Sequence, residues 1–212
     1  MTNYKITLKS EKKTERELQE VQFNLDFIFK IICGCGFPIA KFKTDTTFNN
    51  STYCTNKKIT SHREIDMINK KDIRRIKKII CVLNSSEIDR DKVNLLKSII
   101  DIAMSQVPNS GMSGAFYIVI LESLFVPEKD SEIGYRFSMR LSKIRRGDSS
   151  YKKQIKDCYN KRSIIFHSGK DKFKKNDLNF IEEEACWAIE KYLIQPDIFS
   201  NNCEKIDELL IK

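Results

Sequence analysis

Two residues near the C-terminal end of the chain carry side chains that suit phosphodiester chemistry. Arg162 and His167 lie in the run Tyr-Asn-Lys-Arg-Ser-Ile-Ile-Phe-His-Ser-Gly, which ends at Gly169. An imidazole can move protons near neutral pH, and a guanidinium offers a fixed bidentate fork to phosphate oxygens. RNA cleavage that uses the ribose 2′-hydroxyl as nucleophile needs both functions. The pair therefore suggests metal-independent RNA cleavage, with His167 as general acid/base and Arg162 as transition-state clamp.

The spacing of the pair has a geometric consequence. The run is expected to close a helix, along which five residues correspond to ~140° of rotation and ~7.5 Å of rise. Arg162 and His167 then do not share one stripe, and a single copy is an incomplete site that a second copy across a two-fold axis would complete. The simpler interpretation is that Arg162 is a surface arginine and that His167 satisfies carbonyls at the helix end.

Three further residues are candidates for a supporting role. Glu122 interrupts an apolar helix face, and a carboxylate there is expected to pair with Arg162 or Arg140, unless it is a solvated charge. Ser163 either orients a ligand or packs. Tyr159 either stacks on a base or belongs to the core, and the core is favoured. The second histidine, His62, has no partner motif and receives no role.

Positive charge is concentrated around the motif. The chain has a formal net charge of +9, which fits a polyanionic partner or, more simply, a lysine-rich proteome. Between residues 135 and 175 there are 14 Lys and Arg against 3 Asp. This local excess predicts that the protein binds RNA through contacts with its phosphate backbone. The residues expected to bind RNA are Arg136, Arg140, Lys143, Lys161 and Lys170.

Composition narrows the remaining possibilities. The 7 cysteines are odd in number and lack a disulfide framework, which indicates a reducing cytoplasm. The spacing of Cys33 and Cys35 is not that of a zinc or redox site, so neither a metal nor another cofactor is expected. The longest apolar runs, 27–35 and 115–121, are too short to span a membrane, and no signal peptide is evident.

From residue 71 onward, apolar residues recur at three- and four-residue steps, which predicts five or six amphipathic helices in an up-and-down bundle. A short terminal helix is expected over 203–212. Asn109 or Ser110, Ser149 or Ser150, and Asn176 are expected to cap helix starts. Gly147 and Gly169 are expected just after helix ends. One predicted inward face consists of Leu178, Ile181, Ala185, Ile189 and Tyr192.

The first 70 residues give a mixed pattern. Residues 4–8 alternate like a strand, and 41–54 are typical of a hairpin or irregular loop. Residues 15–33 can form a helix with Val21, Leu25, Ile28 and Ile32 on one face. We therefore expect a small α+β appendage over 1–70, or part of a larger or truncated domain there, followed by a helical domain over 71–212.

Three segments resemble the HEPN superfamily, and within it the Apea-like HEPN domains. Residues 118–124 resemble the second helix of the family, with its LE-x-L core, and 132–141 resemble its third. Residues 159–169 resemble the family's Y-x-x-R-S-x-x-x-H-G segment, in which Arg162 and His167 fill the R-x4-H motif. Ser168 departs from the pattern, because many members have glycine directly after the histidine. The resemblance covers roughly half of the chain.

The resemblance implies a metal-independent endoribonuclease that works as a homodimer, with both R-x4-H motifs lining one cleft. Family members often act as toxins or antiviral effectors in prokaryotes. Two alternatives share the fold and the charge. One is a non-catalytic HEPN-like module that binds RNA or pairs with another protein. The other is an antitoxin-like regulatory partner of a separate nucleotidyltransferase.

Overall fold

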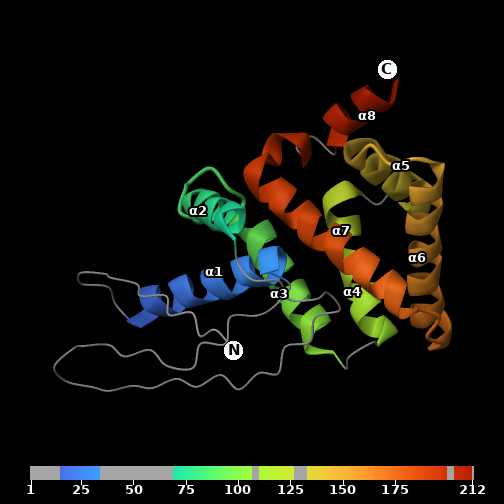
Figure 1. Cartoon of the computed structure of the whole chain (residues 1–212), viewed down its shortest axis with the longest axis horizontal. Helices are drawn as coiled ribbons and strands as arrows, with labels where there is room; N and C mark the ends of the chain where they lie inside the picture. The colour runs from blue at the N-terminus through green and yellow to red at the C-terminus, as the bar shows by residue number, and fades with distance from the viewer. Residues whose placement is uncertain (1–14, 34–68, 107–109, 127–132, 200–202, 212) are drawn as a thin grey trace.

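Helices make up the regular structure of the part of the chain that is described. The computed structural model describes residues 15–33, 69–106, 110–126, 133–199 and 203–211 (Figure 1). The mainly α helical bundle expected from the sequence is confirmed. The strand expected over 4–8 and the hairpin over 41–54 lie outside the described residues. The helices are α1 (Glu15–Cys33), α2 (Lys70–Leu83), α3 (Arg90–Ser105), α4 (Gly111–Phe125), α5 (Ile133–Arg145), α6 (Ser149–Ser168), α7 (Lys175–Ile194), the 3-10 helix η1 (Pro196–Phe199) and α8 (Glu204–Ile211).

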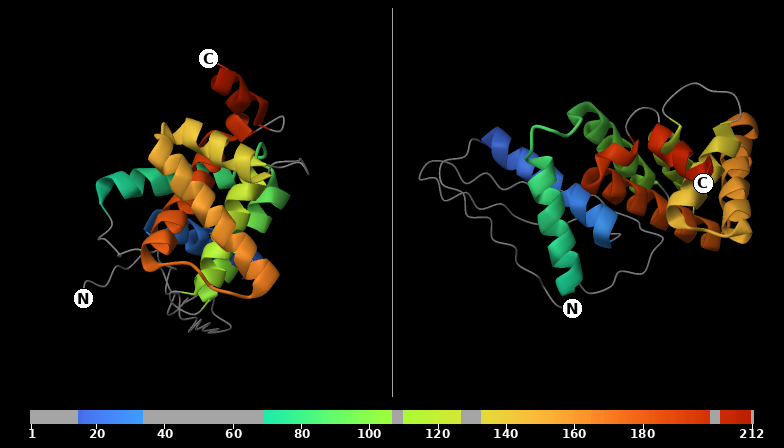
Figure 2. Two further views of the ribbon diagram at one scale, coloured as in Figure 1. Left: turned by 90° about the vertical axis from the view of Figure 1, so that its right-hand side faces the viewer. Right: turned by 90° about the horizontal axis from the view of Figure 1, so that it is seen from above.

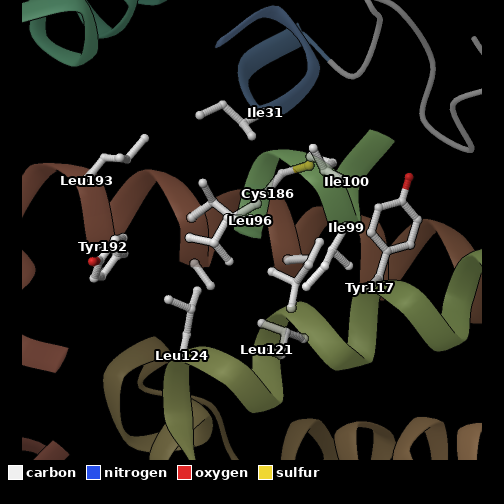
Figure 3. Packing of buried hydrophobic residues seen from close by; sticks show 14 of the residues in the cluster. Ile31, Leu96, Ile99, Ile100, Tyr117, Leu121, Leu124, Cys186, Tyr192 and Leu193 are labelled. Atoms are coloured by element: carbon white, nitrogen blue, oxygen red, sulfur yellow. The ribbon is translucent and has the colours of Figure 1, made fainter. Parts of the chain in front are cut away.

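Helix α4 lies at the centre of the bundle. It is apolar around most of its circumference, which is typical of a helix buried on all sides. It packs against α3, α5, α6 and α7. Figure 3 shows Leu121 and Leu124 of α4 facing the same cluster as Leu96 of α3 and Tyr192 of α7. Every neighbour of α4 is therefore placed by the same apolar surface.

The N-terminal helix belongs to this core. Phe27, Ile28 and Ile31 of α1 are buried in the same cluster as residues of α3, α4 and α7. Figures 1 and 2 show α1 beside α2 and α3 at one end of the molecule, with α5, α6 and α8 at the other. The helix predicted over 15–33 is confirmed. Helix α1 lies before the boundary expected at residue 70, yet it packs into the same core as the helices that follow that boundary.

One of the three predicted helix starts has its expected cap, and the other two caps lie one or two residues before those expected. Ser110 caps α4 as predicted, and its hydroxyl accepts the Met112 N–H. Helix α6 is capped by Asp148 rather than by Ser149 or Ser150, and its carboxylate accepts the Tyr151 N–H at 2.8 Å. Helix α7 begins at Lys175, so Asn176 lies inside it rather than at its cap. The predicted inward face of α7 is confirmed, because its five residues are buried.

A residue with left-handed backbone conformation follows both α5 and the motif helix α6. Gly169 follows α6 with φ 67°, as predicted, and its N–H donates to the Ile165 carbonyl. After α5 the left-handed position is occupied by Arg146, with φ 53°, rather than by Gly147. The Gly147 N–H closes the turn on the Ser142 carbonyl at 2.8 Å. A non-glycine residue is strained in this conformation.

The loop that leaves α6 is attached to the start of α4. The Asp171 carboxylate accepts the Gly111 N–H at 2.6 Å and the Phe173 N–H at 2.9 Å. A Cβ on Gly111 would lie 2.1 Å from Asp171 Oδ1, so the approach requires glycine. This contact holds the chain just after the motif against the central helix. None of the helices in the described segments is long and apolar enough to cross a membrane.

We predict that Gly111→Ala destabilises the fold by about 1–2 kcal/mol, because the methyl group displaces the carboxylate and leaves its hydrogen bonds unmade. Chemical denaturation measures the change. In the Asp171→Ala background the same substitution is expected to cost much less, because the clash is gone. Equal costs in both backgrounds would contradict the proposed contact.

Candidate active site

Arg162 of the motif is paired with a carboxylate of the central helix. Its Nη2 donates to Glu122 Oε2 at 2.9 Å, with the two side chains 26% and 16% exposed. Of the two partners considered for Glu122, the structure shows Arg162. Because α4 is held on all sides, this ion pair fixes the guanidinium relative to the core. The Nε–H of the same guanidinium is buried and makes no hydrogen bond to a described residue, so an anion could contact Arg162 only through its terminal nitrogens.

Aromatic rings of α6 flank the same guanidinium. Arg162 Cζ lies 5.0 Å from the ring centre of Phe166 and 6.0 Å from that of Tyr159. Tyr159 packs on Phe137 of α5, and a Cβ on Gly134 would lie 2.7 Å from its ring. Tyr159 therefore has the core position favoured from the sequence. Phe166 was not predicted, although its four-residue step from Arg162 places it on the same face.

Burial changes the chemistry of the pairing carboxylate. Removal from water raises the pKa of Glu122, and the positive charge of Arg162 only partly opposes this. The carboxylate is therefore easier to protonate than an exposed glutamate. Protonation of Glu122 would remove the negative charge that now neutralises Arg162.

His167 is exposed in the last turn of α6. The carbonyls it could have satisfied are taken by other groups: the Gly169 N–H donates to Ile165 and the Ser168 hydroxyl to Ile164, each at 2.8 Å. Within the described residues, no hydrogen bond joins the imidazole to Arg162. The structure thus leaves His167 accessible, about 1.4 helical turns after Arg162.

Exposed lysines follow His167 in the chain. They lie in the segment 169–174, which connects α6 to α7, and at Lys175, the first residue of α7. This surface, which we call the lysine loop, consists of Lys170, Lys172, Lys174 and Lys175. Since none forms an ion pair with a described residue, their charge is available to a polyanion. Ser163 is half-buried on the motif helix.

Several of the arginines and lysines expected to bind RNA are held inside the protein instead. Arg140 is buried, with its guanidinium bonded to Asp207 of α8 and to the Phe125 carbonyl. Lys161 is half-buried and pairs with Asp177 at 2.7 Å. Arg136 is also half-buried, whereas Lys143 and Lys170 are exposed. The expectation is therefore wrong for Arg140, because its α5 face meets α8 rather than solvent.

The described residues contain no cluster of three or more histidine, cysteine or acidic side chains that could hold a metal ion. No protein-family model matches the chain, and neither curated proteins nor solved structures gave a match. The chemistry of the site is therefore inferred from its own residues.

We predict that Arg140→Met destabilises the fold by about 1–3 kcal/mol, because the buried Phe125 carbonyl loses its donor. Hydrogen bonding to Arg140 lowers the pKa of Asp207 below its usual 3.8. The pair therefore stabilises the fold above that pH and loses this effect as the pH falls through the lowered pKa. Denaturation between pH 3 and 7 should show the stability difference between wild type and Arg140→Met becoming smaller at the acid end, while the part due to the Phe125 carbonyl persists at every pH.

Lys143→Met is the matched control on the same helix. Its side chain is exposed and forms no ion pair with a described residue, so stability is expected to change by less than about 0.5 kcal/mol at every pH. An Arg140→Met protein as stable as this control would show that the Arg140 pair contributes nothing.

Proposed function

We propose that the protein is a metal-independent endoribonuclease of the HEPN type, with Arg162 and His167 as its catalytic residues. The observation that carries the proposal is the contrast between the two side chains. Arg162 of α6 is held by Glu122 of the central helix, whereas His167, also on α6, is exposed just before the lysine loop. A rigid cation and an accessible proton carrier, next to unpaired lysines, suit an RNA phosphodiester.

Each residue has a defined role in this proposal. His167 removes the proton of the ribose 2′-hydroxyl, or delivers a proton to the departing 5′-oxygen. Arg162 binds the non-bridging phosphate oxygens, whose negative charge grows as the 2′-oxygen attacks. Glu122 is a positioning residue that acts through Arg162. The products are a 2′,3′-cyclic phosphate and a 5′-hydroxyl, and water is not consumed in this step.

The proposed reaction needs a second copy of the chain to provide both proton-transfer groups. One copy of the motif supplies a single histidine, whereas a concerted step needs one group to accept a proton and another to donate it. Ile164 and Phe166 are 39% and 48% exposed beside the motif, and their apolar surface suits contact with a symmetric partner. We therefore propose a homodimer in which two motifs share one cleft. A role in prokaryotic antiviral defence or toxin-type stress responses is proposed from the resemblance alone, and a cytoplasmic location from the cysteines.

We predict that His167→Ala abolishes RNA cleavage while changing stability by less than about 0.5 kcal/mol, because the side chain is exposed and makes no hydrogen bond to a described residue. Arg162→Ala should also abolish cleavage. The measurement is cleavage of single-stranded RNA in excess chelator, with the product ends identified by mass spectrometry.

Asn160→Ala is the matched control, an exposed position on the same helix outside the candidate site. It should cleave at the wild-type rate. A single 2′-deoxy substitution at the cleavage position should block the reaction while leaving binding intact. Cleavage by His167→Ala at the wild-type rate would refute the assignment.

The alternative function is a non-catalytic module that binds RNA or another protein. One observation favours it: Glu122 already neutralises Arg162, as in many purely structural ion pairs. In that case purified wild-type protein binds RNA, or co-purifies with a regulatory partner, but produces no cyclic phosphate. The chelator experiment above decides between the two functions.

Both functions predict that RNA binding depends on the lysine loop. Affinity for a short single strand should fall steeply between 50 and 200 mM salt, as about 0.7 counterion is released per phosphate contact. Lys170→Gln with Lys172→Gln should reduce the slope of log affinity against log salt by about 1.4. Lys153→Gln, on the exposed side of α6, should leave the slope unchanged. Filter binding or fluorescence anisotropy measures it, and a flat salt dependence would contradict the prediction.

A further inference from the structure

A pocket of about 770 Å³ lies at the opposite end of α6 from the motif. Its walls come from the end of α5, the α5–α6 turn, the start of α6, and residues of α7, η1 and α8. Figure 1 shows that the α5–α6 turn and the α6–α7 loop are at the two ends of α6. The rise per helical residue puts His167 ~27 Å from the first residue of α6. The pocket is therefore a separate feature from the candidate active site.

The pocket is lined by cations from four helices and a turn. Lys143, Arg146, Lys191 and Lys205 line it, and none of them forms an ion pair with a described residue. Lys152 also lines it, and its ammonium contacts Met139 and lies 4.9 Å from the centre of the Tyr135 ring. Cations without counter-charges repel one another when they converge, so this arrangement favours a bound anion.

A single carboxylate lines the same pocket. Asp148 is the N-cap of α6, and it accepts the Tyr151 N–H at 2.8 Å. Its charge is thus used on the helix start, where it offsets the positive end of the helix dipole. Five cations against this one carboxylate leave the pocket strongly positive.

The second, independent observation is a buried hydroxyl. Ser142 lines the pocket with a relative exposure of 7%, and its Oγ is buried without a hydrogen-bond partner among the described residues. A buried hydroxyl that makes no hydrogen bond is unfavourable by about 1–3 kcal/mol. Rotation about its Cα–Cβ bond lets this group donate to an acceptor in the pocket.

Arg146 adds a conformational argument. It occupies the left-handed position after α5, where glycine would be unstrained and where the following residue is a glycine. Arg146 is nevertheless one of the residues that line the pocket. Strain of this kind is typical of positions kept for their side chain.

We propose that this pocket binds a compact oligophosphate, such as a diphosphate or triphosphate group, independently of the proposed RNA cleavage. The cations converge from α5, α6, α7 and α8 on a concave site rather than following a line, which fits a short, highly charged group better than an extended strand. The volume lies within the usual range for small-molecule sites. The group can come from inorganic triphosphate or from a nucleoside 5′-triphosphate, because the residues named here contact the phosphates.

Isothermal titration calorimetry of the full chain with inorganic triphosphate, in buffer without divalent cations, tests the proposal. We expect one site per chain. Arg146→Gly should weaken binding by about tenfold or more, equivalent to one charged hydrogen bond. The same substitution relieves the strained backbone, so its melting temperature should not fall, and lost affinity cannot be attributed to unfolding. Ser142→Ala should also weaken binding without lowering stability.

Lys153→Gln is the matched control, since this exposed lysine of α6 does not line the pocket. It should retain wild-type affinity for triphosphate. Titration with ATP distinguishes the sources: equal affinity indicates the phosphate chain alone, and tighter binding of ATP indicates a nucleotide.

Three results would overturn the proposal. They are no binding of triphosphate at millimolar concentration, equal weakening by Lys153→Gln and Arg146→Gly, and Arg146→Gly weakening the binding of single-stranded RNA but not of triphosphate. The last would make the pocket part of a strand-binding surface. None of these results bears on cleavage, because that activity is measured with His167 and Arg162 variants at the other end of α6.

Discussion

Burial of α4 on every side is the constraint on which the rest of the structure depends. A helix without a polar face must be covered by neighbours, and α3, α5, α6 and α7 supply that cover. Glu122 is the charged residue of this helix, and its carboxylate needs a partner where α4 meets α6. Arg162 is that partner. The position of the motif arginine therefore follows from packing of the core, which gives it a rigidity that an exposed arginine would lack.

Periodicity was sufficient to predict the helices because each buries one apolar stripe against the centre. The helix over 15–33 has its predicted bounds, and the five residues expected to face inward on α7 are buried. The sequence indicated that Glu122 could pair with an arginine, because a carboxylate on an apolar helix needs a partner, but it left Arg162, Arg140 and a solvated charge open. What periodicity could not show is that α1 joins the main core, since an amphipathic stripe does not identify its neighbour.

Charged residues were harder to place, and α5 shows why. Arg140, Lys143, Arg145 and Arg146 lie within seven residues and look alike in sequence. Arg140 pairs with Asp207, 67 residues away, and Arg145 with Glu184, while lying 4.5 Å from the ring centre of Trp187. Lys143 and Arg146 reach the pocket. The partners belong to α7 and α8, so tertiary contacts alone decide which cations remain available.

Because some cations between residues 135 and 175 are paired and others are not, this basic segment does not act as a uniform charged surface. Counted along the chain, 14 cations suggest one continuous surface around the motif. In the fold, Arg140, Arg145, Lys161 and Arg162 are each matched by a carboxylate. The lysine loop beside His167 and the pocket at the α5–α6 turn stay unpaired, at opposite ends of a 20-residue helix. At ~1.5 Å per residue the two are too far apart to contact the same phosphate. The unpaired cations at the two ends of α6 are therefore assigned to two different proposed anion sites, with Lys153 and Lys156 exposed on the helix between them.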